Sequence, residues 1–183
     1  MKNTHRITVA SRRLKRTCTG LIIFLPLTCA LFWIFFNQLY SQASIVPVSM
    51  VPLPVRVTQN LSGLIRLLAF LTEMIPLTAM IYGLLHLREL FRLYENGFIF
   101  TEKNVACFRS LGRILIIWVF CNFVKNSLLS VVLTLPNPPG HRTITLGLYS
   151  ADFTAIFVGI VILIIAWVMD EARLIHEDQA LFI

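Results

Sequence analysis

Four apolar stretches follow one another along the chain, and charged residues or prolines separate them. They cover about residues 21–40, 64–87, 114–135 and 153–169. Each has a length within the range of about 17–25 residues that a helix needs to cross the hydrocarbon core of a bilayer. The pattern therefore predicts an all-α integral membrane protein with four transmembrane helices.

The segments around these stretches complete the predicted domain plan. A transmembrane domain at residues 20–169 carries all four spans. The other parts are a basic tail (1–19), two proline-containing loops (41–63 and 136–152), a polar hairpin (88–113) and an acidic amphipathic tail (170–183). Within the hairpin, Asn96-Gly97 is expected to end one helix, and Thr101 is expected to cap the next helix at Glu102.

Lysine and arginine gather on one predicted side of the membrane. Residues 1–16 contain six of them, the hairpin contains five and the acidic tail contains one, whereas the two loops on the other side contain only Arg56 and Arg142. Cytoplasmic segments carry such an excess of positive charge, so both termini are predicted to be cytoplasmic. A cleavable signal peptide is the alternative for the first stretch, but its length and its bulky Phe32 and Trp33 favour an uncleaved anchor.

Composition narrows the class of protein further. Of the 183 residues, 57% are hydrophobic and 14% are charged, and the mean hydropathy is +0.77. Soluble domains carry about 25% charged residues, so a water-soluble enzyme is excluded. The net charge of +7 is concentrated beside the spans, which favours lipid headgroups as partners and argues against direct nucleic acid binding. No nucleophile–base pair, metal-ligand spacing or phosphate loop is found, so neither catalysis nor a cofactor is expected.

Two charged residues lie deep inside the predicted spans. Glu73 is about 21 Å from the cytoplasmic end of its helix and Lys125 is about 18 Å from the same end of the next helix, at about 1.5 Å per residue. An isolated charge at such a depth costs about 2.5–3.5 kcal/mol on insertion scales. We therefore expect Glu73 and Lys125 to interact.

Polar residues accompany Lys125 along its helix. Asn122, Asn126 and Ser130 recur at a spacing of four residues, which places them on one face. Near the outer ends of the spans, Arg66 and Asp152 are a second predicted pair. These groups either hold the helix bundle together or line a polar cavity for an ion, a proton or a small ligand.

Two segments on the cytoplasmic side resemble a known family. Residues 97–104 read Gly-Phe-Ile-Phe-Thr-Glu-Lys-Asn, residues 108–112 read Phe-Arg-Ser-Leu-Gly, and the acidic tail ends on apolar residues. This pattern resembles the bacterial four-helix membrane family catalogued as domain of unknown function 2975. The residues that carry the resemblance in the hairpin are Gly97, Phe98, Phe100, Thr101, Asn104, Arg109 and Gly112.

The resemblance implies a multi-pass protein of the bacterial inner membrane. Members of the family are often encoded beside a small helix-turn-helix regulator, which implies a cytoplasmic transcriptional regulator as partner. The family has no established catalytic residues, so none can be assigned here. In the hairpin, Phe98, Ile99 and Phe100 are expected to dock into the bundle, and the alternative is that they bind a partner.

Two main functions remain open from the sequence. The first is a non-enzymatic membrane sensor or regulatory partner, which rests on the cytoplasmic segments and the family resemblance. The alternative is an ion- or proton-coupled transporter or channel subunit that uses the Glu73/Lys125 cluster, which with four spans implies a homo-oligomer. An immunity protein against a membrane-active toxin is a further alternative.

Overall fold

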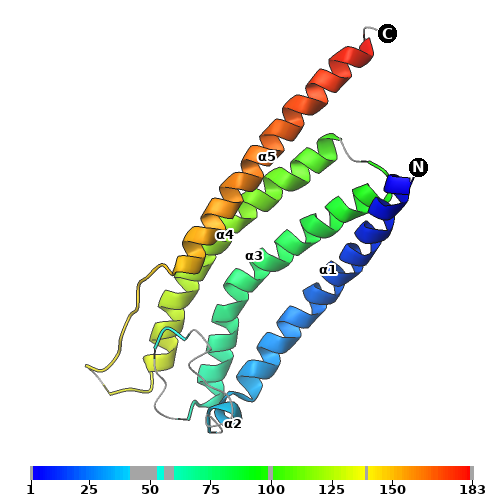
Figure 1. Cartoon of the computed structure of the whole chain (residues 1–183). Coiled ribbons are helices and arrows are strands. Elements are labelled where there is room, and N and C mark those ends of the chain that lie inside the picture. Colours follow the sequence, from blue (N-terminus) through cyan, green and yellow to red (C-terminus); the bar gives the residue numbers. More distant parts are fainter. Residues whose placement is uncertain (1, 42–52, 56–59, 99–100, 139, 182–183) are drawn as a thin grey trace. The chain divides into compact units, whose positions relative to one another are not determined.

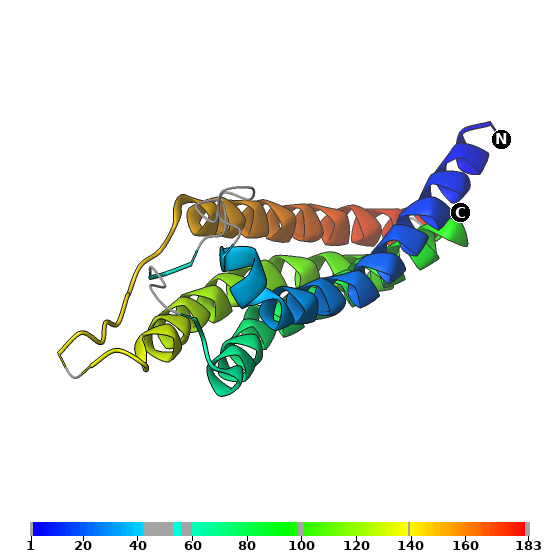
Figure 2. The same ribbon diagram turned by 90° about the horizontal axis from the view of Figure 1, so that it is seen from below.

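The described part of the chain contains five helices. The computed structural model describes residues 2–41, 53–55, 60–98, 101–138 and 140–181, and these contain no strand. In chain order, the helices are α1 (Lys2–Ile34), α2 (Phe36–Ser41), α3 (Gly63–Glu95), α4 (Glu102–Thr134) and α5 (Ser150–Leu181) (Figure 1). The short helix α2 follows α1 directly, as Figure 2 shows.

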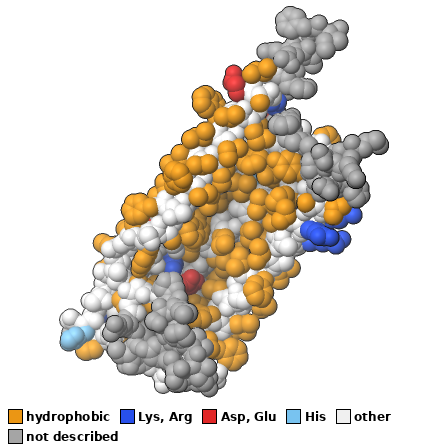
Figure 3. Space-filling view, in the orientation of Figure 1, with side chains coloured by type: hydrophobic (Ala, Val, Ile, Leu, Met, Phe, Trp, Pro, Cys, Tyr) orange, Lys and Arg blue, Asp and Glu red, His pale blue; other side chains and the backbone are white. Residues whose placement is uncertain are grey.

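Four of these helices are long and apolar enough to cross a membrane. The candidate spans are Thr8–Ile34, Gly63–Glu95, Glu102–Thr134 and Ser150–Ile175. Large hydrophobic side chains stay exposed along them, and hydrophobic side chains cover most of the face seen in Figure 3. Phe24, Phe120 and Trp167, for example, are 58%, 69% and 69% exposed. Such surfaces are typical of a multi-pass membrane protein, since water would penalise them.

The helices extend beyond the predicted spans. Helix α1 begins at Lys2, within the predicted basic tail, and continues through Pro26 to Ile34. Helix α5 continues through the acidic tail, where Arg173 bonds to Asp170 one turn away at 3.2 Å. Helix α4 runs from Glu102 to Thr134, so it starts where the sequence predicts and stops just before Pro136.

The chain divides into two compact units. The first comprises Met1–Ile23, Ala79–Val119 and Ser150–Ile183. Its buried core contains Leu90, Leu93 and Cys107. In this unit α4 and α5 approach closely at two glycines: a Cβ built on Gly112 would lie 2.6 Å from Cγ of Leu163 and 2.9 Å from the carbonyl oxygen of Gly159. Small residues that allow two backbones to meet are typical of helix packing in membranes.

The second unit comprises Phe24–Thr78 and Phe120–Tyr149. Trp33 stacks on Phe36 with ring centroids 5.2 Å apart, and both belong to a core that α3 and α4 complete. Asn37 makes two hydrogen bonds to the backbone of Leu61, donating to its carbonyl oxygen at 2.9 Å and accepting from its amide at 3.0 Å. These bonds fix the chain just before α3 begins.

The glycine contact between α4 and α5 generates a stability prediction. We expect Gly112→Ala to destabilise the protein by about 1–3 kcal/mol, because the new methyl group meets backbone as well as side chain. The control is Gly20→Ala in α1, where nothing lies within 4 Å of the added Cβ. That change is expected to stabilise α1 by about 0.5–1 kcal/mol. The measurement is the free energy of unfolding in detergent micelles, and equal effects of the two variants would contradict the contact.

Candidate functional site

Glu73 on α3 and Lys125 on α4 lie together in the second unit. The Nζ of Lys125 is 3.7 Å from Oε1 of Glu73, and the two side chains are 11% and 29% exposed, respectively. The structure thus brings together the two residues that were predicted to interact from their similar depths along the helices. The separation is that of an ion pair and exceeds the usual hydrogen-bond length of about 2.7–3.2 Å. Each charge offsets the other in a setting where neither is fully hydrated.

The polar residues on α4 differ in their contacts: Lys125 pairs with Glu73, whereas Ser130 bonds to the backbone. Lys125 and Asn126 are buried, and Asn122 is partly buried. Ser130 is also buried, but its hydroxyl is used by the backbone: it donates to the carbonyl oxygen of Ser127 at 2.7 Å and accepts from the amide of Thr145 at 2.9 Å. Ser130 therefore attaches the segment after α4 to that helix.

A similar bond reinforces this attachment one turn further along α4. The amide of Thr143 donates to the hydroxyl of Thr134 at 3.3 Å. The hydroxyl of Thr145 donates to the carbonyl oxygen of Pro54 at 3.4 Å, which joins the two predicted outer loops. Sequence periodicity placed Ser130 on the face of Lys125, but it gave no sign that a loop returns to that face.

The two residues of the predicted outer pair belong to different units. Arg66 belongs to the second unit, where its Nη1 donates to the carbonyl oxygen of Ile34 at 2.7 Å. Asp152 belongs to the first unit and is only 1% exposed. The pairing of Arg66 with Asp152 stays a prediction. The bond from Arg66 to α1 was not predicted, because nothing in the sequence marks Ile34 as a helix end.

The turn after α3 is built around Gly97. This residue has a φ of 81°, in the left-handed region that glycine adopts most readily. The amide of Gly97 donates to the carbonyl of Tyr94 at 3.1 Å, and the amide of Phe98 donates to the carbonyl of Leu93 at 3.0 Å. This pair of bonds is the Schellman arrangement that ends many helices. Asn96-Gly97 thus ends α3 as the sequence predicts.

Asn104 holds the far side of the same turn. Its side chain is completely buried, and its Nδ2 donates to the carbonyl oxygen of Phe98 at 2.8 Å. Thr101 occupies the predicted cap position, and its carbonyl oxygen accepts from the amide of Asn104 at 2.9 Å. The expected side-chain cap is absent, because the Thr101 hydroxyl has no hydrogen-bond partner among the described residues. Asn104 connects the two ends of the turn in its place.

Two further residues of the family-like motif connect α4 to α5. Arg109 donates to Asp170 at 3.0 Å, and Gly112 lies at the close contact with Gly159. Phe98 differs from both, because its side chain is 54% exposed. The expectation that Phe98 docks into the bundle is therefore wrong. Ile99 and Phe100, for which docking was also expected, lie outside the described residues.

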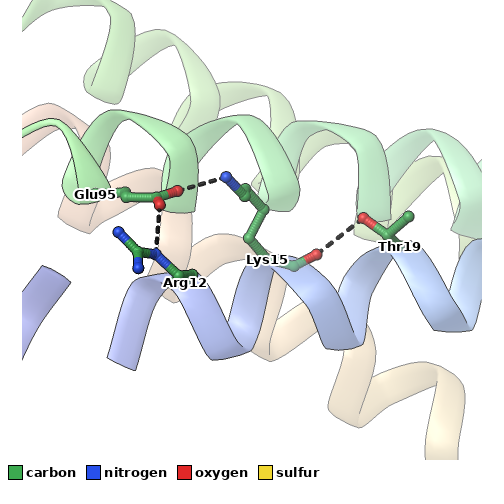
Figure 4. Close-up of polar contacts among 4 residues, drawn as sticks. All are labelled: Arg12, Lys15, Thr19 and Glu95. Atoms are coloured by element: carbon green, nitrogen blue, oxygen red, sulfur yellow. Dashed lines mark hydrogen bonds and ion pairs between the residues drawn. The ribbon is translucent and has the colours of Figure 1, made fainter. Parts of the chain in front are cut away.

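The basic start of α1 is attached to the end of α3. Arg12 Nε lies 2.9 Å from Oε1 of Glu95, and Lys15 bonds to the other carboxylate oxygen (Figure 4). Glu95 lies beyond the predicted span, and the hydrogen bonds from Lys15 and then Arg12 lower the pKa of its carboxyl group. This contact was not predicted from the sequence. The feature of the sequence that could have indicated it is Glu95, an acidic residue at the helix end on the same predicted side of the membrane as the basic tail.

The comparisons with known proteins give one match. The profile of the family described as "Protein of unknown function (DUF2975)" matches residues 54–183, which is more than half of the chain. The matched region contains the Glu73/Lys125 pair and the whole turn from Gly97 to Asn104, and it confirms the resemblance drawn from the sequence. Neither the curated proteins nor the solved structures contain a match.

The ion pair generates a prediction that a double-mutant cycle can test. Glu73→Gln and Lys125→Met each leave one charge unpaired, so each single variant is expected to be clearly destabilised. The double variant is expected to be less harmed than the sum of the two, with a coupling of about 1–3 kcal/mol. The readout is the free energy of unfolding in detergent micelles, and strictly additive losses would refute the coupling.

The buried asparagine generates a local prediction. Asn104→Leu keeps the volume but leaves the carbonyl of Phe98 without its donor, which is expected to cost about 1–3 kcal/mol. Hydrogen exchange of the amides of residues 96–105 measures the effect and is expected to accelerate. Asn137→Leu is the matched control, since Asn137 also donates to a backbone carbonyl, that of His141, but in an exposed turn. If both variants exchange like the unchanged protein, the structural role of Asn104 is refuted.

Proposed function

The chain belongs to the family of proteins of unknown function catalogued as DUF2975, and we propose that it is a non-enzymatic regulatory protein of the bacterial inner membrane. Its partner in this proposal is a cytoplasmic helix-turn-helix protein. The observation that carries the proposal is Phe98 after α3, whose backbone is bonded to Leu93 and Asn104 while the residue stays exposed.

The turn has the physical features of a recognition surface. The amide of Phe98 donates to Leu93 and its carbonyl oxygen accepts from Asn104, so this residue is already held in place before a partner binds it, which lowers the entropy cost of binding. Aromatic side chains dominate binding energy when a partner buries them. Phe98 is 54% exposed, so a role in the hydrophobic core does not explain an aromatic residue at this position.

Charge supports a cytoplasmic location for this turn. The residues near it include Arg88, Arg92, Lys103, Arg109 and Arg113, and the positive-inside rule places such segments in the cytoplasm. The basic start of α1 bonds to Glu95, two residues before Gly97. In our proposal, the amino-terminal segment and the turn therefore face the same compartment, where a soluble regulator can reach them.

The second candidate function is ion- or proton-coupled transport. The observation that favours it is the partial exposure of Glu73, at 29%, combined with a 3.7 Å separation from Lys125 that leaves the carboxylate without a direct hydrogen bond to the ammonium group. A carboxylate in this state could exchange a proton or an ion. Replacement of both residues by leucine distinguishes the candidates: regulation is expected to persist, whereas ion flux in liposomes would be lost.

The regulatory proposal is tested by site-specific crosslinking in cells. We expect a photoreactive benzoylphenylalanine at Phe98 to crosslink to a soluble protein that carries a helix-turn-helix. The control position is Ile144, which is 69% exposed and lies in the predicted loop on the opposite side of the membrane. Phe98→Ser is expected to reduce recovery of the same protein by about tenfold, equivalent to a loss of about 1.4 kcal/mol.

The crosslinking pattern decides between regulation and its alternatives. Equal crosslinks from positions 98 and 144 would contradict recognition at the turn. Crosslinks from position 98 to lipid alone would show that Phe98 lies in the bilayer interface. Both results would favour transport. The next measurement is then ion flux in liposomes with the variant in which leucine replaces Glu73 and Lys125.

A further inference from the structure

A groove of about 370 Å³ opens between the end of α1 and the start of α3 in the second unit. Its lining includes Trp33, Ile34, Gly63, Arg66, Leu67 and Phe70. The volume lies at the lower end of the range of about 300–1,000 Å³ that small-molecule sites occupy. Apolar side chains thus form most of its wall, and one permanent positive charge is present.

Arg66 has donors that the protein leaves unused. Its Nη1 donates to the carbonyl oxygen of Ile34 at 2.7 Å, which satisfies a backbone acceptor at the end of α1. Its Nε is buried and has no hydrogen-bond partner among the described residues. A guanidinium group offers five N–H donors in a fixed plane, and that geometry suits carboxylate and phosphate oxygens.

Trp33 adds a second unused donor at the same groove. The side chain is 2% exposed, and its Nε1 also has no acceptor among the described residues. Buried polar groups in proteins nearly always have a partner. Two residues that line one groove thus carry N–H donors without an acceptor among the described residues, and one of the two is a cation, so an anionic acceptor would suit both.

Helix α3 contributes to the same electrostatic preference. It begins at Gly63, which lines the groove, and an added Cβ on Gly63 would meet nothing within 4 Å. The amino-terminal end of a helix carries partial positive charge and attracts anions. Ser62 accepts from the amide of Ile65 at 3.5 Å, and Gly63 has no side chain that would cover the backbone beside it.

The surroundings of the groove select a lipid rather than a soluble anion. Both of its helices are long and apolar enough to span a membrane, and the groove lies near an end of each. Leu64, Leu67 and Leu71 on α3 are 68%, 57% and 54% exposed, so the neighbouring surface is apolar. Tryptophan and arginine near the ends of spans are typical of the level of lipid headgroups.

We propose that this groove binds an anionic phospholipid, with the phosphodiester held by Arg66, Trp33 and the start of α3. The first part of an acyl chain lies against Leu67 and Phe70. The phosphate oxygens supply the acceptors that Arg66 and Trp33 lack, and the apolar wall adds affinity that a soluble phosphate would not gain. This site is independent of the proposed contact at Phe98.

The test uses the full chain, delipidated in a neutral maltoside detergent. The chain has three tryptophans, so Trp118→Phe together with Trp167→Phe leaves the fluorescence of Trp33 as the signal. The probes are phosphatidylglycerol, the diacylglycerol with the same acyl chains, and inorganic phosphate. We expect saturable changes with phosphatidylglycerol and at least tenfold weaker apparent affinity for the other two probes.

Variants connect the signal to the groove. Arg66→Gln removes the charge and is expected to weaken phosphatidylglycerol binding at least tenfold. Arg142→Gln is the matched control: it removes an exposed arginine that the sequence also places on the outer side, and its binding is expected to be unchanged. Gly63→Leu fills the groove while it keeps Arg66 and Trp33, and it is expected to weaken binding to a similar extent.

Circular dichroism of each variant measures its helix content, which separates loss of binding from loss of folding. If Arg66→Gln loses helix because Ile34 loses its donor, Gly63→Leu alone decides. Unchanged binding in a folded Gly63→Leu variant would overturn the proposal. Equal binding of diacylglycerol would overturn the role of the phosphate, and equal saturation by inorganic phosphate would overturn the assignment to a lipid.

Discussion

Hydrocarbon offers no hydrogen bonds, so a polar group on an apolar helix needs its partner within the protein or at the membrane surface. Lys125 has Glu73 at 3.7 Å, and the Ser130 hydroxyl binds the backbone on both sides. Arg66 satisfies the last carbonyl of α1. The contacts of Lys125 with Glu73 and of Arg66 with Ile34 each join two helices, so the same requirement that neutralises the polar groups also specifies which helices pack together.

The contacts that the sequence predicted are those with a fixed local geometry. A constant rise per residue gives the depths of Glu73 and Lys125, so their similar depth can be calculated without knowledge of the packing. Asn96-Gly97 ends α3 because glycine readily takes the positive φ that the turn requires. In both cases the decisive quantity belongs to one helix or one turn.

The contacts that the sequence missed depend on how the chain returns to an earlier segment. Ser130 shares the helical face of Lys125, yet Thr145 occupies its hydroxyl, and no periodicity in α4 contains that information. Arg66 bonds to Ile34 at the end of α1, and no glycine or proline marks that helix end in the sequence. Phe98 was expected to be buried on general grounds of hydrophobicity, and only the structure shows that Asn104 fixes the turn without it.

Two buried hydrogen-bond donors have no acceptor among the described residues. A buried Nε on Arg66 and a buried Nε1 on Trp33 would both cost free energy in an apolar setting if no acceptor were ever present. The fold tolerates them at one groove, beside the positive end of α3. Both helices of the groove are long and apolar enough to span a membrane, and a headgroup phosphate is the acceptor in our proposal. In that proposal, a bound lipid supplies the hydrogen-bond acceptors that the described part of the second unit lacks.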